Sequence, residues 1–272
     1  CTVPSAPEPP STCAPLVYAH PGMPPSICVV LNTRDRSPGP NYLGQTLEAL
    51  RASVEHLDLQ VVDGGSRDPA EFARRERVWS NGVTFHPGAR TWTRNDAGCR
   101  CLEIGLARRA DWILYLEDDI LVCHDFVRSV DRWLADHARP ARRGVTLYTF
   151  YCLFGRMVED VARGYWVYPT PQFNGCQAFA LRSTDASGAL EWIRPRLAGW
   201  GSPGGFDRLL SAWLMAAGGC LYASVPSFVQ HVGFVTAMGY PHWHQSPTWP
   251  GSDWTYLGLD PRPPAAVGSG AC

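Results

Sequence analysis

From Ser26 onward, short apolar runs alternate with segments whose apolar residues recur at helical spacing. Short apolar runs predict buried strands, and apolar residues three and four positions apart predict amphipathic helices. The predicted strands cover 26–33, 59–63, 82–86, 111–117 and 144–150, and the helices between them cover 41–57, 68–78, 94–110 and 125–137. This alternation predicts an α/β fold with a mostly parallel sheet and helices on both faces.

The second half of the chain follows a weaker pattern. Strands are expected over 176–183 and 220–225, and helices over 185–197 and 206–218. An open, mostly parallel sheet binds its ligands beyond the carboxyl ends of its strands. The candidate chemistry is therefore expected at those strand ends.

Length and composition fit one globular α/β protein. The 272 residues suffice for a large core, and 45% hydrophobic with 18% charged residues is typical of a folded chain. The formal net charge of −1 lacks the basic excess of a nucleic-acid binder. We expect a proline-rich tail over 1–25, an α/β domain over 26–239, and an aromatic, proline-rich segment over 240–272 that packs on the same domain.

The cysteines indicate the compartment. None of the 10 cysteines forms a CxxC pair, which argues against a structural zinc site. Cys1, Cys13 and Cys272 lie in the tails, where disulfides to the body of the protein are expected. Such disulfides imply an oxidising compartment. Cys28 and Cys176 lie in apolar runs and are expected to be core residues.

The sequence contains no apolar stretch of membrane-spanning length. The chain begins at Cys1, without a methionine or a signal peptide. We therefore expect a mature or truncated form, and any signal or anchor lost with the preceding residues would not be visible in this sequence.

Three acidic residues, Glu117, Asp118 and Asp119, follow the apolar run 112–116. Adjacent carboxylates repel one another and are costly to desolvate at the end of a core strand. They could hold a divalent cation together with a diphosphate, act as a general acid/base pair, or cap the following helix in a solvated turn. We favour the metal, because capping needs only one acid and no core strand before it.

The segments "VVLNTRDR", "NYLGQTL", "YLEDDI" and "PSFVQHVG" occur in this order over 26–236. In this the chain resembles a group of GT-A glycosyltransferases with an EDD motif, which includes N-acetylglucosaminyltransferase IV and the GPI-glycan N-acetylgalactosamine transferase. The resemblance implies a Rossmann-like nucleotide-diphospho-sugar transferase with 26–239 as its catalytic domain. It also implies inverting transfer of a sugar, first of all N-acetylhexosamine, from a UDP-sugar to a glycan hydroxyl. For a eukaryotic protein, it implies the Golgi lumen.

The same resemblance implies roles for the acidic triplet and for one histidine. Asp119 and His231 would bind Mn²⁺ or Mg²⁺, since carboxylate oxygen and neutral imidazole suit Mn²⁺. Asp118 and Glu117 would face ribose and sugar hydroxyls, or reach the metal through water. Without the acidic triplet, we would interpret His231 as an ordinary hydrogen-bonded residue after a strand.

An inverting transferase also needs a base for the acceptor hydroxyl. Asp207 follows the glycine-containing stretch 201–205 and opens a predicted helix, which is where many GT-A enzymes carry their base. An acid there is also favoured by the helix dipole. Asp185 and Glu191 are competing acids on an ordinary amphipathic helix.

Further donor-binding candidates follow or precede the predicted strands. They are Thr33, Arg34 and Arg36 after the first strand, Asp63 after the second, Arg94 and Asp96 at the start of a helix, and Asn174 and Gly175 in a turn. Thr33 and Arg36 would face base and ribose, Arg94 a phosphate, and Asp96 uracil or ribose. Gly175 would permit close approach of the donor sugar. Each of these residues can also be explained without a bound ligand, as a surface charge, as a helix cap or as part of a plain turn.

The last 33 residues are rich in aromatic side chains, among them Tyr240, Trp243, Trp249, Trp254 and Tyr256. They could stack on acceptor sugars or form a lid over the sheet edge. The expected partners are a nucleotide sugar and a glycan acceptor, without nucleic acid. A retaining transferase, a nucleotidyltransferase or an inactive carbohydrate-binding protein on the same fold are the alternatives.

Overall fold

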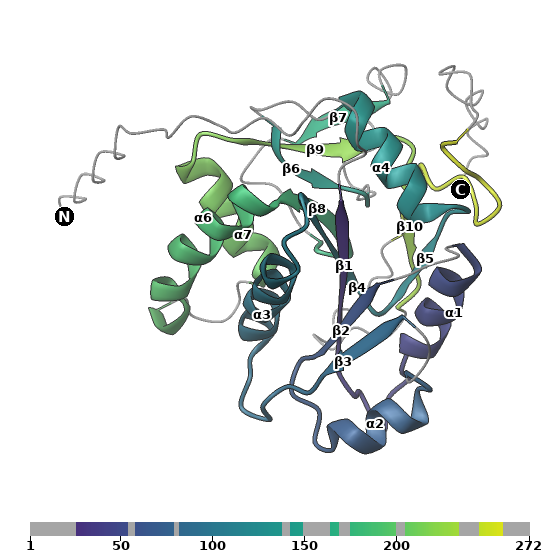
Figure 1. Ribbon diagram of the computed structural model, residues 1–272, viewed down its shortest axis with the longest axis vertical. Coiled ribbons are helices and arrows are strands. Elements are labelled where there is room, and N and C mark those ends of the chain that lie inside the picture. The colour runs from purple at the N-terminus through teal and green to yellow at the C-terminus, as the bar shows by residue number, and fades with distance from the viewer. Residues whose placement is uncertain are drawn as a thin grey trace, which may run out of the picture.

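The computed structural model describes residues 26–53, 58–78, 82–137, 142–148, 164–168, 175–199, 205–233 and 245–257. Its centre is an eight-stranded sheet with the strand order β3-β2-β1-β4-β8-β6-β9-β7 (Figure 1). The strands are β1 (Ile27–Thr33), β2 (Leu59–Asp63), β3 (Val83–His86), β4 (Trp112–Glu117), β6 (Arg142–Thr146), β7 (Tyr165–Tyr168), β8 (Ala178–Arg182) and β9 (Cys220–Ser224).

Most of the sheet is parallel, as the sequence predicts. Strands β3, β2, β1 and β4 are parallel neighbours, and so are β6 and β9. Strand β8 runs antiparallel to both β4 and β6, and β7 runs antiparallel to β9. The central strands β1, β2 and β4 are almost continuously apolar because helices cover both of their faces.

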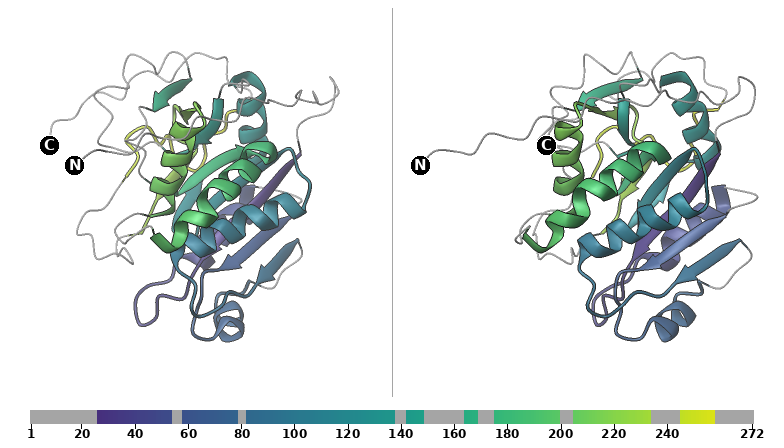
Figure 2. Two further views of the ribbon diagram at one scale, coloured as in Figure 1. Left: turned by 90° about the vertical axis from the view of Figure 1, so that its left-hand side faces the viewer. Right: turned by 60° about the vertical axis from the view of Figure 1, so that its left-hand side comes forward.

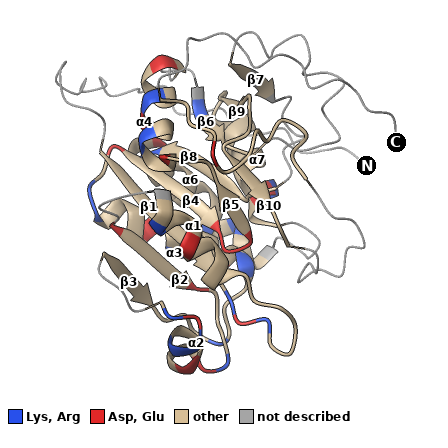
Figure 3. Cartoon of the chain, turned by 90° about the vertical axis from the view of Figure 1, so that its right-hand side faces the viewer, with Lys and Arg blue, Asp and Glu red and all other residues tan. Residues whose placement is uncertain are grey.

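Two sets of helices cover the two faces. Helices α3 (Arg94–Ala107), α6 (Ser183–Ile193) and α7 (Phe206–Ala216) share one core cluster, and a 3₁₀ turn, η3 (Arg194–Gly199), continues α6 (Figure 2). Helices α1 (Leu43–Ser53), α2 (Pro69–Arg75) and α4 (Phe126–His137) share the other cluster. Figure 3 views this second face and shows charged residues along α4 and α2. The described helices are too short or too polar to cross a membrane.

A two-stranded sheet, which the sequence pattern does not predict, lies beside the acidic triplet. It pairs β5 (Ile120–Val122) with β10 (Val229–His231) in antiparallel fashion, so that His231 lies opposite Ile120. The ladder continues with a bond from the Val232 N–H to the Asp119 carbonyl at 2.9 Å. These bonds bring a late segment of the chain against the end of β4.

The described part of the aromatic C-terminal segment covers the second face of the sheet. The rings of Trp254 and Tyr256 lie 5.2 and 5.7 Å from that of Phe228. The His124 N–H donates to the Trp254 carbonyl at 2.8 Å. These two aromatic residues therefore pack as a cover on the core, whereas Tyr240 and Trp243 lie outside the described residues.

The described cysteines are free thiols. Cys28, Cys99, Cys101, Cys123 and Cys176 are buried and Cys220 is exposed. Burial raises the pKa of Cys28 to about 11, so this thiol stays protonated in the core. The prediction that Cys28 and Cys176 are core residues is confirmed. The expected disulfides of Cys1, Cys13 and Cys272 lie outside the described residues.

Helix α3 approaches its neighbours closely through two glycines. A Cβ at Gly98 would lie 2.5 Å from Cγ of Phe206 in α7, and one at Gly105 would lie 2.6 Å from Cγ2 of Ile113 in β4. The two positions are seven residues apart and share one side of the helix. This contact seats α7, and with it Asp207, over the sheet.

We predict that Gly98→Ala lowers the free energy of unfolding by about 1–2 kcal/mol, because the overpacking cost exceeds the gain in helix propensity. Urea denaturation measures the change. The matched control is Gly188→Ala in α6, where a Cβ would lie 3.9 Å from the Trp213 ring and should stabilise the protein. Equal effects of the two substitutions would contradict the close packing of α3.

Candidate active site

The acidic triplet ends β4 at the carboxyl edge of the parallel strands. Glu117 is the last residue of β4, and Asp118 and Asp119, 2% and 7% exposed, follow it. Because successive side chains of a strand point to opposite faces, Glu117 and Asp118 face opposite sides of the sheet. The triplet therefore presents carboxylates on both faces of the sheet edge.

Asp118 is held from the loop after β1. The Thr33 hydroxyl donates to Asp118 Oδ2 at 2.6 Å, and Arg36 Nη2 lies 2.5 Å from Asp118 Oδ1 and 3.4 Å from Asp119 Oδ2. Burial raises the pKa of Asp118 to about 6, although the charge of Arg36 opposes this. Thr33 and Arg36, both predicted from the sequence, thus lie together with the triplet.

Asp119 and His231 meet across the β5–β10 pair. His231 Nε2 lies 3.3 Å from Asp119 Oδ2, and both side chains are at least nine-tenths buried. Burial opposes ionisation of Asp119, but the nearby His231 and Arg36 hold the pKa of Asp119 below its usual value. Burial, with the charge of Asp119 next in size, raises the pKa of Glu117 to about 8.

This pair fits a hard divalent cation. Asp119 Oδ1 is buried and has no hydrogen-bond partner in the described part of the chain. A Cβ at Gly233 would lie 2.7 Å from Asp119 Oδ2 and 2.8 Å from His231 Nε2, so a glycine keeps this space open. The described residues include no cluster of three or more His, Cys, Asp or Glu ligands. Two protein ligands leave positions that water or oxygen atoms of a bound ligand would have to fill.

Asp207 and Gly175 also lie together. The Gly175 N–H donates to Asp207 Oδ2 at 3.0 Å, and the Arg208 N–H donates to Oδ1 at 2.9 Å. Gly175 has a φ of 97°, which favours glycine. Asp207 lies in the first turn of α7, and its charge contributes to the raised pKa of Glu117. Asn174 lies outside the described residues.

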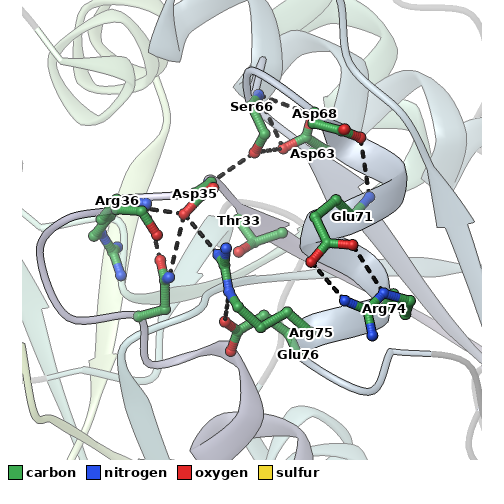
Figure 4. A network of polar contacts seen from close by, with 12 residues as sticks. Thr33, Asp35, Arg36, Asp63, Ser66, Asp68, Glu71, Arg74, Arg75 and Glu76 are labelled. Atoms are coloured by element: carbon green, nitrogen blue, oxygen red, sulfur yellow. Dashed lines mark hydrogen bonds and ion pairs between the residues drawn. The ribbon is translucent and has the colours of Figure 1, made fainter.

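The loop that carries Arg36 is fixed by Asp35, which the sequence analysis overlooked (Figure 4). The Asp35 N–H donates to Ser66 Oγ at 2.8 Å, and Arg75 Nη2 donates to Asp35 Oδ1 at 2.8 Å. Although burial opposes it, hydrogen bonds from Ser37, Asn41 and Arg75 lower the pKa of Asp35 to about 2. Asp35 therefore ties the loop after β1 to α2.

The remaining donor-side candidates have local partners or face solvent. Asp63 is fully buried and accepts the N–H groups of Ser66 at 3.0 Å and Gly88 at 3.3 Å. Asp96 forms a capping box with Thr93 at the start of α3. Each carboxylate thus has a structural task within its own loop.

The other charged candidates lie on the surface or in a separate ion pair. Arg34 and Arg94 are exposed, and so is the competing acid Glu191. Asp185 lies 3.5 Å from Arg143 in a separate ion pair. The structure therefore brings Thr33, Arg36, the triplet, Gly175, Asp207 and His231 to one edge of the sheet.

Two buried polar residues hold the site in place, and the sequence analysis missed both. The Thr46 hydroxyl in α1 lies 2.7 Å from the Asp118 carbonyl and 2.8 Å from the Ile120 carbonyl, and it accepts the Ile120 N–H at 3.2 Å. Gln230 Oε1 accepts the N–H groups of His231 at 3.1 Å and Ser246 at 2.7 Å. Thr46 lies within the segment "NYLGQTL", and Gln230 lies within "QHVG". These two segments were the sequence signals that could have pointed to both residues.

No protein-family model matches the chain, and no curated protein matches it in sequence. Solved structures do resemble it. GalNAc-T7 with UDP, GalNAc and Mn²⁺ aligns with a TM-score of 0.54 and 12% identity, over 79% of this chain and 45% of that one. A mannosyltransferase from Pyrobaculum calidifontis with GDP-Man and Mn²⁺ aligns with a TM-score of 0.48 and 19% identity, over 84% of this chain and 62% of that one. The chain spans less than two thirds of either protein.

The similarity to GalNAc-T7 defines the fold class. The chain has the Rossmann-like α/β fold of the GT-A glycosyltransferases, as the sequence predicts. At this level of identity the similarity concerns the fold, so the chemistry has to be argued from the site itself.

We predict that Thr46→Val lowers the free energy of unfolding by about 1–3 kcal/mol, because it leaves the buried Ile120 N–H without an acceptor. Urea denaturation measures the loss. Thr46→Ser keeps the hydroxyl and should stay closer to the unmodified protein. A Thr46→Val protein as stable as the Thr46→Ser protein would show that the hydroxyl does not hold the turn.

Proposed function

We propose that this chain is a metal-dependent glycosyltransferase that moves a sugar from a nucleotide-diphosphate sugar to a hydroxyl group of a glycan acceptor. The observation that carries the proposal is the buried pair Asp119–His231, 3.3 Å apart, at the carboxyl edge of a GT-A-type sheet. The resemblance at "LEDDI" and "QHVG" supports a UDP-sugar as donor, first of all a UDP-N-acetylhexosamine, and inversion at the anomeric carbon.

The nucleotide diphosphate is proposed to bind on the Arg36 side of the sheet edge. Asp119 and His231 would hold Mn²⁺ or Mg²⁺, and a metal bound there would neutralise charge on the departing diphosphate. Arg36 presents its guanidinium beside these ligands, and its buried Nη1 has no partner in the described part of the chain. That N–H can donate to a phosphate oxygen in a charge-assisted hydrogen bond.

Asp207 is proposed to take the proton of the acceptor hydroxyl. Its two oxygens each accept one backbone N–H, which fixes the carboxylate and leaves lone pairs for the substrate. Removing the proton as the oxygen attacks the anomeric carbon is general base catalysis. Its bond to Gly175 places the carboxylate beside a glycine, which leaves room for an acceptor next to it.

We predict that Asp119→Asn weakens Mn²⁺ binding by at least about 10-fold. Removing a residue that only hydrogen-bonds to a metal ligand already lowers metal affinity by about that factor, and Asp119 is proposed to bind the metal directly. Calorimetric titration with Mn²⁺ measures this, and UDP release from UDP-GlcNAc and UDP-GalNAc should fall with it and stop in EDTA. Glu191→Gln removes an exposed carboxylate of α6 and serves as the matched control. Full Mn²⁺-dependent activity of Asp119→Asn would overturn the metal assignment.

We predict that Asp207→Asn lowers kcat by about 10²–10⁴-fold, the usual contribution of a general base, and leaves the affinity for Mn²⁺ and UDP unchanged. Steady-state transfer kinetics and UDP titration separate these two effects. Full activity with Asp207→Asn, or loss of activity with Glu191→Gln, would assign the base elsewhere. Analysis of the product anomer tests the retaining transferase, and an assay for pyrophosphate release tests the nucleotidyltransferase.

A further inference from the structure

A row of polar side chains crosses three neighbouring strands at the site. Asn32 in β1 pairs with Glu117 in β4, and the Glu117 N–H donates to the carbonyl of Gln177, just before β8, at 2.9 Å. Paired positions on neighbouring strands point to the same face of a sheet. Asn32, Glu117 and Gln177 therefore form one row on one face, which we call the amide row.

The row directly below is apolar and fixes the orientation of the amide row. Val30 pairs with Tyr115, and Tyr115 pairs with Phe179. The rings of Tyr115 and Phe179 are stacked, with their centroids 4.6 Å apart. All three belong to the core under α3, α6 and α7. The amide row is thus the polar rim of this core, at its ligand-facing end.

The two amides of the row are incompletely hydrogen-bonded. Asn32 Nδ2 donates to the Tyr115 hydroxyl at 2.9 Å, but Asn32 Oδ1 and Gln177 Oε1 are buried and have no partner in the described residues. A buried amide oxygen without a donor is destabilising, and native proteins rarely leave one unpaired. A hydroxyl can donate or accept, so it satisfies an amide in either orientation.

The amide row lies on the side of Asp207, away from the Arg36 side. Phe206, next to Asp207, packs 6.0 Å from the Tyr115 ring and 6.3 Å from the Phe179 ring. Gly175, which donates to Asp207, has its Cα beside the Gln177 amide. The unpaired Arg36 Nη1 is a donor that suits phosphate, whereas the row offers polar groups that suit hydroxyls.

We propose that the Asn32 and Gln177 side chains, on either side of Glu117, bind hydroxyl or amide groups of the transferred sugar. Neighbouring strands lie about 4.8 Å apart, so several groups of one sugar ring can reach the row. The inference rests on the proposed function and names its donor-sugar site. Gln177 is the more informative position, since the structure records no hydrogen bond that its side chain makes to the described residues.

The test compares UDP with UDP-GlcNAc. Calorimetric titration in Mn²⁺ yields both dissociation constants, and their ratio isolates the contribution of the sugar. Gln177→Leu should reduce this ratio about 10-fold and change the dissociation constant of UDP less than about twofold. Asn32→Leu should act in the same direction, although it also removes the Tyr115 bond.

Two controls separate this role from a structural one. Thr33→Val removes the bond to Asp118 on the opposite face and should weaken UDP and UDP-GlcNAc by the same factor, leaving their ratio unchanged. Gln177→Leu should keep or raise the melting temperature, because it replaces an unpaired buried amide. A marked fall would assign Gln177 a structural role and overturn the proposal.

The remaining outcomes are distinct. An unchanged ratio in the Gln177→Leu protein, with tight binding of UDP-GlcNAc, overturns the sugar site and leaves the proposed function standing. Failure of the unmodified protein to bind UDP-GlcNAc and UDP-GalNAc more tightly than UDP overturns the sugar site as well. Failure to bind UDP in Mn²⁺ overturns the proposed function and this inference together.

Discussion

The structure depends on burying Asp118 and Asp119, with the half-buried Glu117 beside them, at the end of a core strand. Charged groups in such a place are destabilising unless other groups offset their desolvation. Thr33 and Arg36 do this for Asp118, and His231 does it for Asp119. The end of β1 and the loop after it bring Thr33 and Arg36 to Asp118, and the β5–β10 pair brings His231 to Asp119.

Strand alternation gives the site its two sides. Because Glu117 and Asp118 point to opposite faces, the sheet edge separates a charged side at Arg36 from the side of Asp207, where we propose that the sugar hydroxyls bind. A nucleotide sugar has the same division, since its diphosphate is anionic and its sugar is neutral and rich in hydroxyls. The position of each side chain in the triplet thus matches a different part of the proposed donor.

Much of the fold could be predicted from local patterns. The apolar period indicated strands and helices close to their observed bounds, for example 94–110 against Arg94–Ala107 for α3. Family resemblance paired Asp119 with His231, and the structure brings them within 3.3 Å. The β5–β10 pair escaped prediction because three-residue strands carry too little pattern.

The sequence by itself determined the α/β class, the acidic triplet at a strand end and the composition of the core, because side-chain periods of 2 and 3.6 residues are local properties. The tertiary structure decided the partners. Thr46 reaches the triplet from 72 residues away, and Asn32 and Gln177 align with Glu117 through strand register. Register depends on how distant strands pair, and a single local pattern does not specify that pairing.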